Sequence, residues 1–369
     1  MIKKLFVHNF RCLENFELSL AELPTGLLIG KNGAGKSTVA AVLEILQRIA
    51  RGQNRVGDLV TPEDFAHGRA DVPIRFDIEA EISGRQFGYK LALEFPEGFH
   101  ELRVMEETLT ADGETVISRK GAQVSLRKTE ADNDSRFFMD WHMVALPVVQ
   151  ERRDPDPVAT FRTWLSRMLI LAPVPSLIGG ESSGETLFPD RQCKEFGRWF
   201  TGIISQSPRA YGEIETELRQ WMPDFLEVKN PQTGKNSRTL SVIFKGTSKT
   251  FEAPFDVLSD GEKIFFIAAL VIAAQKVYGP IFCFWDEPDN YLALPEIGHF
   301  VATLRGAMRN GAQFLATSHN PEAIRKFSDN NTFFLYRDSH LEPTRKKLLT
   351  EMDIEGDLIE ALVRDDLGA

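Results

Sequence analysis

The sequence predicts an α/β fold with an antiparallel β lobe and a compact helical insertion. Three observations support this: a glycine-rich segment between a strand and a helix, a run of alternating strands over residues 74–127, and helical spacing over residues 155–222. The chain has 369 residues with 43% hydrophobic content. That length suits two domains, or one domain carrying an insertion.

The glycine-rich segment follows the apolar run Leu27–Ile29 and fits the pattern G-x-x-x-x-G-K-[ST]. Residues 40–49 behind it keep helical spacing, and Gly52 supplies a stop signal. Strand, glycine loop and helix together form the context of a phosphate-binding loop, and an ordinary glycine-rich turn is the weaker alternative.

Each residue type in this loop suits a nucleotide phosphate. Glycines allow successive amides to turn inward, Lys36 brings a positive charge, and the Ser37 hydroxyl can ligate Mg²⁺ at the positive end of a helix dipole. The nucleotide-binding residues predicted here are Gly30, Asn32, Gly33, Ala34, Gly35, Lys36, Ser37 and Thr38.

The sequence pattern of the remaining N-terminal half predicts β-strands. Strands are expected at 2–8, 16–20, 74–82, 87–95, 102–110, 115–119 and 124–127. Arg11 lies in a turn from which it can reach a bound nucleotide, although a lone arginine in a turn is usually solvated. Gln150 ends the apolar segment 143–149, and at a strand end it could ligate Mg²⁺; a surface glutamine without a ligand is the alternative.

Residues 155–222 predict a compact group of helices. Asp156-Pro157 is an N-cap followed by a first-turn proline, and two more amphipathic helices are expected around 196–203 and 208–222. No sustained heptads are present, so a coiled-coil arm is not expected. A hairpin of residues 225–229 and 239–244 follows, with a further strand at 250–253.

Two later stretches carry candidate chemistry. Ser259 is a predicted cap of the apolar helix 264–274, and the amides at Asp260 and Gly261 would bind an anion there. The buried-type strand 281–285 ends in Asp286-Glu287, where Asp286 can hold Mg²⁺ and Glu287 can polarise the attacking water.

A further strand, 313–317, precedes His319, which can contact the terminal phosphate or hold Glu287 and water in line. Alone, a histidine after a strand is more often structural, and an acidic pair is often only surface charge.

Together these residues resemble the ABC-type ATPases, and within them the soluble branch related to SMC and RecF heads. The resemblance is carried by five features: the opening segment 7–11, Walker A at 30–37, the signature at 258–263, Walker B at 282–287 and the switch histidine His319. Asp286-Glu287-Pro288 followed by 292–296 looks most like the AAA-family ABC-like ATPases of bacterial antiphage defence, relatives of the OLD family.

The resemblance implies ATP and Mg²⁺ as cofactors and a head-to-tail homodimer. Nucleotide bound by Lys36 and Ser37 of one subunit would be closed over by Ser259 and Gly261 of the other. The expected activity is hydrolysis of ATP to ADP and phosphate, slow until a partner completes the site. Asp260 stands where relatives often have a second glycine, and this variant suits the non-transporter branch.

The expected domain organisation has four parts. They are an N-terminal ATPase lobe (1–133), a mainly helical insertion (134–222), a C-terminal ATPase lobe (223–345) and an acidic tail (346–369) with Leu358, Ile359, Leu362 and Val363 at helical spacing. Relatives with a nuclease carry a TOPRIM domain after the ATPase, and we expect none here because only about thirty residues follow the strand 333–336.

The resulting functional hypothesis is an ATP-dependent switch that controls a separately encoded effector in antiphage defence. The alternative is a DNA-repair or chromosome-organising ATPase that binds DNA directly. A net charge of −10 favours the first, while leaving nucleic-acid binding open. Three scattered cysteines, no signal peptide and no bilayer-length apolar run predict a cytoplasmic protein without a membrane contact.

Overall fold

The computed structural model describes residues 1–127, 135–150, 156–308, 310–327 and 329–352. Its contacts divide the chain into two compact units. Unit 1 comprises Met1–Leu23, Ile29–Met168 and the chain from Phe333 onward, and unit 2 comprises Pro24–Leu28 and Leu169–Thr332. The four-part division expected from the sequence, with boundaries after 133, 222 and 345, is not tested by these two units and stays a prediction.

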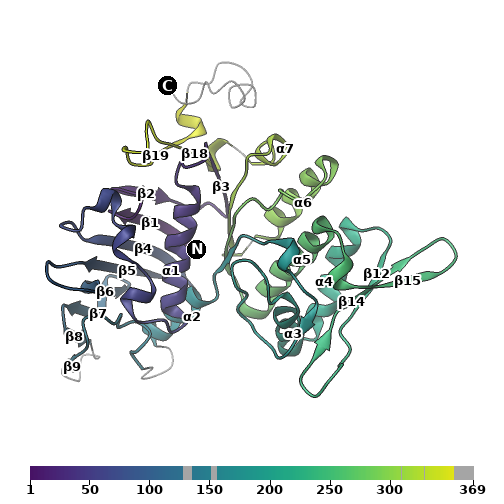
Figure 1. The fold of residues 1–369 in the computed structure, drawn as a ribbon, viewed down its shortest axis with the longest axis horizontal. Coiled ribbons are helices and arrows are strands. Elements are labelled where there is room, and N and C mark those ends of the chain that lie inside the picture. The colour runs from purple at the N-terminus through teal and green to yellow at the C-terminus, as the bar shows by residue number, and fades with distance from the viewer. Residues whose placement is uncertain (128–134, 151–155, 309, 328, 353–369) are drawn as a thin grey trace. The chain divides into compact units, whose positions relative to one another are not determined.

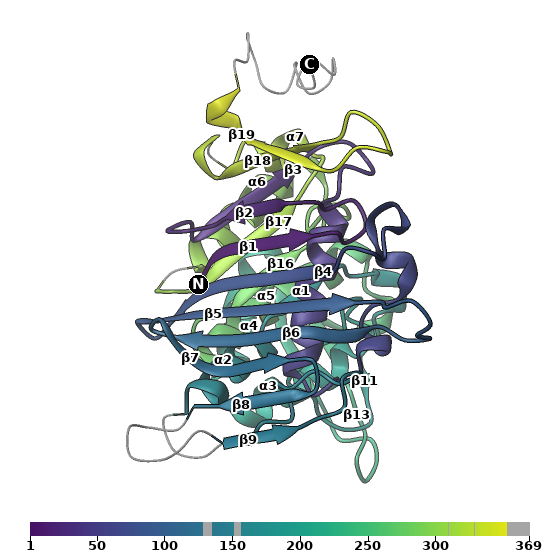
Figure 2. The ribbon, with the colours of Figure 1, turned by 90° about the vertical axis from the view of Figure 1, so that its left-hand side faces the viewer.

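Unit 1 is built on an eight-stranded antiparallel sheet, in the order β2-β1-β4-β5-β6-β7-β8-β9 (Figure 2). The strands are β1 Ile2–His8, β2 Phe16–Ser19, β4 Ile74–Ile82, β5 Arg85–Glu94, β6 Arg103–Ala111, β7 Glu114–Lys120, β8 Gln123–Leu126 and β9 Ser135–Phe138. The expected antiparallel lobe is confirmed, and β9 is an addition that the sequence pattern did not predict.

One face of this sheet forms the core of unit 1. Along β4, the side chains at every second position from Ile74 to Ile82 are buried, which is the period of a strand with one covered face. Helix α1 (Lys36–Ala50) runs across that sheet in both ribbon views (Figures 1 and 2). Helix α2 (Pro157–Ser166) starts at the predicted cap, where the Asp156 carboxylate accepts hydrogen bonds from Val158 N and Ala159 N.

A buried polar cluster fixes the segment that follows β9. The Glu107 carboxylate accepts hydrogen bonds from Ala145 N at 2.7 Å, Leu146 N at 2.8 Å and the Tyr89 hydroxyl at 3.0 Å. Burial raises the pKa of Glu107, although these donors and the nearby Arg119 oppose that shift. Because the carboxylate satisfies these amides, the segment needs no strand partner. The strand expected before Gln150 is therefore absent, and the chain runs there in turns.

The C-terminal part of unit 1 is a hairpin. Strand β18 (Thr332–Tyr336) pairs antiparallel with β19 (Arg345–Leu348), in register from Phe333↔Leu348 to Tyr336↔Arg345. The helical pattern expected within the acidic tail lies in residues 353–369, outside the described part of the chain.

Unit 2 contains four neighbouring parallel strands of a six-stranded sheet, in the order β10-β16-β17-β3. Its strands are β10 Leu169–Leu171, β16 Phe282–Trp285, β17 Gln313–Thr317 and β3 Thr25–Ile29, and all of their residues are buried. Parallel strands end at a common edge, so the chain leaves Leu171, Trp285 and Thr317 on the same side of the sheet.

The rest of unit 2 is mainly helical. Helix α5 (Asp260–Tyr278) is buried at every residue from Lys263 to Ala274, and helices α3 (Phe196–Gln206) and α4 (Arg209–Trp221) pack against it (Figure 1). The ring of Phe255 stacks on Phe196 at 4.9 Å. The other elements are α6 Leu294–Ala307, α7 Pro321–Ile324, the three-stranded sheet β12 Phe225–Lys229, β14 Ser241–Lys245 and β15 Thr250–Pro254, and the pair β11 Glu181–Ser182 and β13 Arg238–Thr239.

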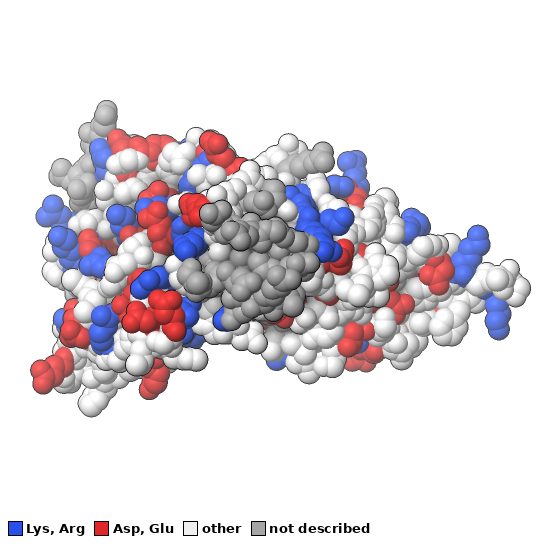
Figure 3. Space-filling view, turned by 90° about the horizontal axis from the view of Figure 1, so that it is seen from above, with Lys and Arg blue, Asp and Glu red and all other residues white. Residues whose placement is uncertain are grey.

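Among the described residues, no helix combines the length and the apolar character needed to cross a bilayer. On the face drawn in Figure 3, acidic and basic side chains are interspersed.

Candidate functional site

The glycine loop lies in unit 1, between the end of β3 and Lys36, the first residue of α1. Gly30 has φ 143° and Gly35 has φ 102°, in the region that glycine alone adopts freely. A Cβ at Gly30 would lie 2.1 Å from the Leu335 carbonyl oxygen, and one at Gly35 would lie 2.6 Å from Thr344 Oγ1. Both positions therefore require glycine for backbone angle and for space.

The connection between β18 and β19 braces this loop from outside. Thr344 Oγ1 donates a hydrogen bond to the Ala34 carbonyl at 3.0 Å, and Arg337 Nη1 donates to the Gly33 carbonyl at 3.3 Å. Lys36 is buried, and its Nζ donates to the Gly30 carbonyl at 2.6 Å and the Lys31 carbonyl at 3.1 Å. These contacts together hold the loop in its shape.

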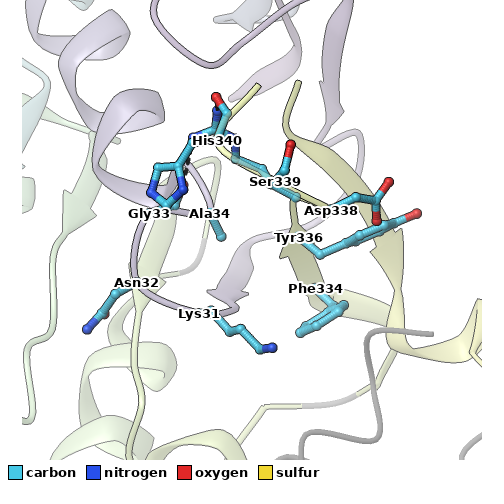
Figure 4. Close-up of a pocket in the computed structure, with 10 residues that line it drawn as sticks. Lys31, Asn32, Gly33, Ala34, Phe334, Tyr336, Asp338, Ser339 and His340 are labelled. Atoms are coloured by element: carbon cyan, nitrogen blue, oxygen red, sulfur yellow. Dashed lines mark hydrogen bonds between the residues drawn. The ribbon is translucent and has the colours of Figure 1, made fainter. Parts of the chain in front are cut away.

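A pocket of about 410 Å³ adjoins the loop within unit 1 (Figure 4). Its walls are formed by Lys31, Asn32, Gly33 and Ala34 of the loop and by Phe334, Tyr336, Arg337, Asp338, Ser339 and His340 of the C-terminal segment. The rings of Phe334 and Tyr336 stack at 5.8 Å, and the His340 ring lies beside Gly33. Both walls come from segments that the bracing contacts hold together.

The structure shows less support for Arg11 and Gln150. Arg11 has φ 51° and its Nε donates to Asp64 Oδ1 at 2.8 Å, so a nucleotide would have to compete with that carboxylate. Gln150 is exposed and follows turns rather than a strand. Both remain predicted ligand contacts that no observation tests.

In unit 2, the acidic pair lies where β16 ends. Thr317 Oγ1, at the end of the neighbouring β17, donates to Asp286 Oδ1 at 2.6 Å and accepts a hydrogen bond from Glu287 N at 2.9 Å. Asp286 N donates to the Leu171 carbonyl at 2.8 Å. Three adjacent strand ends therefore fix the two acidic residues, as the sheet topology predicts.

Glu287 has the geometry expected of a functional carboxylate. Its φ of 51° is a left-handed backbone conformation, which costs free energy at a residue with a side chain. Its Oε2 accepts a hydrogen bond from Asn290 Nδ2 at 2.6 Å, and its Oε1 lies 3.5 Å from His319 Nε2. The structure thus brings Asp286, Glu287 and His319 together, as the sequence spacing suggested.

One residue beside this pair was not predicted. Arg191 Nη2 lies 3.5 Å from Asp286 Oδ2, and the Arg191 carbonyl accepts a hydrogen bond from Ala172 N at 2.8 Å, just past β10. Residues 187–195 carry no recognisable motif, so no local pattern indicated this contact.

The donor groups suit Mg²⁺, which prefers oxygen ligands and keeps part of its water shell. Asp286 offers a carboxylate that is already oriented by a hydroxyl donor on one oxygen. Ser37 offers a hydroxyl in the first turn of α1. Mg²⁺ beside nucleotide phosphates usually has one or two protein oxygen ligands, and the phosphates and water supply the rest.

The signature residues begin α5, as predicted. Ser259 Oγ accepts a hydrogen bond from Glu262 N at 3.3 Å, while the Glu262 carboxylate accepts from Ser259 N at 2.7 Å. A Cβ at Gly261 would lie 3.0 Å from the Tyr291 carbonyl oxygen. Glycine at 261 therefore allows the segment after β16 to approach the helix start closely.

Comparisons with known proteins identify a family and a short stretch of similarity. Residues 27–325 match the family model described as "AAA domain, putative AbiEii toxin, Type IV TA system". A 46-residue stretch is 44% identical to the OLD nuclease of Thermus scotoductus, and it covers 12% of this chain and only 8% of that protein.

Two solved structures share the fold over nearly the whole chain. One is an SMC head bound to the C-terminal winged-helix domain of ScpA, with TM-score 0.57, 13% identity and coverage of 94% of this chain and 98% of the other. The second is an SMC head with an extended coiled coil, bound to the C-terminal domain of ScpA from Pyrococcus furiosus, with TM-score 0.52, 11% identity and coverage of 95% and 96%. At such identities the likeness establishes the fold alone.

The family match spans most of the chain and includes the glycine loop, the helix of the signature, the acidic pair and the histidine. The chain therefore belongs to this AAA-domain family, and it shares its fold with the SMC heads.

Proposed function

We propose that the protein hydrolyses ATP in the cytoplasm and acts as a switch that controls a separately encoded effector in bacterial antiphage defence. The observation that carries the catalytic part is the arrangement of Asp286, Glu287 and His319 at one sheet edge. The family description, which names a toxin and a toxin–antitoxin system, supports a defence role.

Each residue has a distinct role in this proposal. Lys36 neutralises the β- and γ-phosphates, and the loop amides bind their oxygens. Ser37 and Asp286 are the residues proposed as ligands of Mg²⁺, which would supply charge neutralisation when bound with the nucleotide. Glu287 orients the attacking water and accepts its proton, and His319 holds the Glu287 carboxylate in place.

The switch would operate through a nucleotide-dependent dimer. Ser259 and Gly261 begin α5, whose first amides and dipole suit the terminal phosphate of ATP bound to a second copy. ATP then favours the closed dimer, and loss of the γ-phosphate opens it. The solved SMC heads are bound to domains of ScpA, which supports a partner protein for this chain as well.

The fold likeness to SMC heads also favours a second candidate, an ATPase that binds DNA directly during repair or chromosome organisation. The net charge of −10 argues against it, because direct DNA binding needs a basic surface.

The decisive experiment is the mass of three proteins in solution, with and without ATP and Mg²⁺: wild type, Glu287→Gln and Lys36→Ala. Glu287→Gln keeps the shape of the side chain but cannot accept a proton, so we expect it to bind ATP and accumulate as a dimer. Lys36→Ala should lose nucleotide binding and stay unchanged in mass.

Two results would contradict the proposal. Full ATPase activity in Glu287→Gln would remove the assigned role of that carboxylate. A mass of Glu287→Gln that does not respond to ATP, although calorimetry shows ATP bound, would rule out the dimer switch while leaving the nucleotide site intact.

A further inference from the structure

We propose that Arg191 is a positioning residue of the magnesium site, which acts by holding the Asp286 carboxylate. This inference rests on the proposed function and extends it to a residue outside the recognised motifs.

The two oxygens of Asp286 have different partners. Thr317 Oγ1 donates to Oδ1 at 2.6 Å, and Arg191 Nη2 lies 3.5 Å from Oδ2. A carboxylate held on both oxygens has a fixed plane, so its remaining lone pairs point in a fixed direction. Partners of this kind orient metal-binding groups, and their loss typically lowers metal affinity or activity about 10- to 100-fold.

Arg191 is itself held in place by the main chain. Its carbonyl accepts a hydrogen bond from Ala172 N at 2.8 Å, and Asp286 N donates to Leu171 O at 2.8 Å. The end of β10 therefore connects the loop of Arg191 to the end of β16 within unit 2. The side chain of Arg191 is only 26% exposed, and that of Asp286 is 18% exposed, so water weakens this pair less than it weakens a surface pair.

The guanidinium of Arg191 offsets part of the negative charge of Asp286 and its chain neighbour Glu287. Because a positive charge by itself repels Mg²⁺, the role proposed for Arg191 is to orient the Asp286 carboxylate and not to attract the ion. Arginine suits this position because its guanidinium stays charged over the whole working pH range.

The test is calorimetric titration of ATP into the full chain at a series of free Mg²⁺ concentrations, and in EDTA, with Glu287→Gln as the parent to prevent turnover. We expect Arg191→Gln to bind ATP in EDTA with the affinity of the parent. In Mg²⁺, its affinity for ATP should be about 10-fold lower than that of the parent. Arg191→Lys, which keeps a positive charge on a side chain of different shape, should recover part of the Mg²⁺-dependent affinity for ATP. Arg209→Gln, at an exposed arginine that begins α4, is the matched control and should behave as the parent.

A double-mutant cycle tests whether Arg191 acts through Asp286. Added to Asp286→Asn, the Arg191→Gln change should cost no further Mg²⁺-dependent affinity. Three results would overturn the proposal. Mg²⁺ could raise the ATP affinity of Arg191→Gln as much as that of the parent, or Arg191→Gln could lose as much ATP affinity in EDTA as in Mg²⁺. The losses of the two single variants could also add up in the double variant. If the parent binds no ATP in any condition, the proposed ATPase function fails instead, and the two failures are thus distinguished.

Discussion

At the scale of single residues, Asp289 is a buried acid that follows the acidic pair after β16. Its Oδ2 accepts a hydrogen bond from Ser318 Oγ at 3.0 Å, and its Oδ1 is buried without a hydrogen-bond partner among the described residues. Burial raises the pKa of Asp289 to about 6, the charge of Glu287 adds to the shift, and the Ser318 bond opposes it. The folded chain thus retains a proton that the unfolded chain releases near pH 3.8, the ordinary pKa of an aspartic acid.

This shift predicts a stability that falls as the pH rises. Between pH 3.8 and about 6 the folded state binds more protons than the unfolded state, so the free energy of unfolding decreases through that window and levels off above it. From about pH 5 to 7.5 the loss should be about 1 kcal/mol. Asp289→Asn has no charge to bury and should show a flatter dependence. Urea unfolding of both proteins at the two pH values measures this, and equal pH dependence would contradict the assignment.

At the scale of elements, α5 combines a structural and a proposed functional role at one end. The Ser259 hydroxyl caps the helix, and the same exposed hydroxyl is the group proposed to meet the nucleotide of a second copy. Because Asp and Asn also cap helices well, the two roles can be separated by substitution.

In the Glu287→Gln background, we expect Ser259→Asn and Ser259→Asp to keep the stability of the parent to within about 1 kcal/mol. The added carboxylate of Ser259→Asp should repel the phosphates and abolish the ATP-dependent dimer, whereas the neutral Ser259→Asn serves as the matched control. Unfolding midpoints and solution mass with ATP report the two properties. A dimer that forms as readily with Ser259→Asp as with its parent would show that Ser259 is a cap and nothing more.

At the scale of the whole molecule, the charge balance favours effector control over direct DNA binding. The chain carries 53 acidic and 43 basic side chains, and both signs are mixed on the face shown in Figure 3. Counterion release, which drives most binding to duplex DNA, needs a cluster of lysine and arginine.

We therefore expect no tight binding of duplex DNA by wild type or by Glu287→Gln with ATP. Fluorescence anisotropy at about 50 mM and 200 mM salt is the measurement, because a true DNA contact weakens steeply over that range. Tight binding that falls with salt would favour the DNA-processing alternative over effector control.

Local sequence determined the parts of this protein that depend on neighbouring residues. The period-2 pattern of residues 74–127 predicted five strands of the large sheet, and Asp156 and Ser259 predicted helix starts that the structure confirms. The glycine loop was predictable for the same reason, since its backbone angles follow from residue type and from a few adjacent positions.

Tertiary structure decided what depends on residues far apart in the chain. Gln150 follows a segment of turns in which the buried Glu107 carboxylate accepts hydrogen bonds from the amides of Ala145 and Leu146. No local sequence pattern predicts a hydrogen-bond partner so far away in the chain. Arg191 reaches Asp286, 95 positions away, because β10 pairs with β16 and the loop returns beside both. Pairing between distant strands is set by the packing of the whole core, which is why the sequence pointed to the acidic pair and only the fold revealed the arginine beside it.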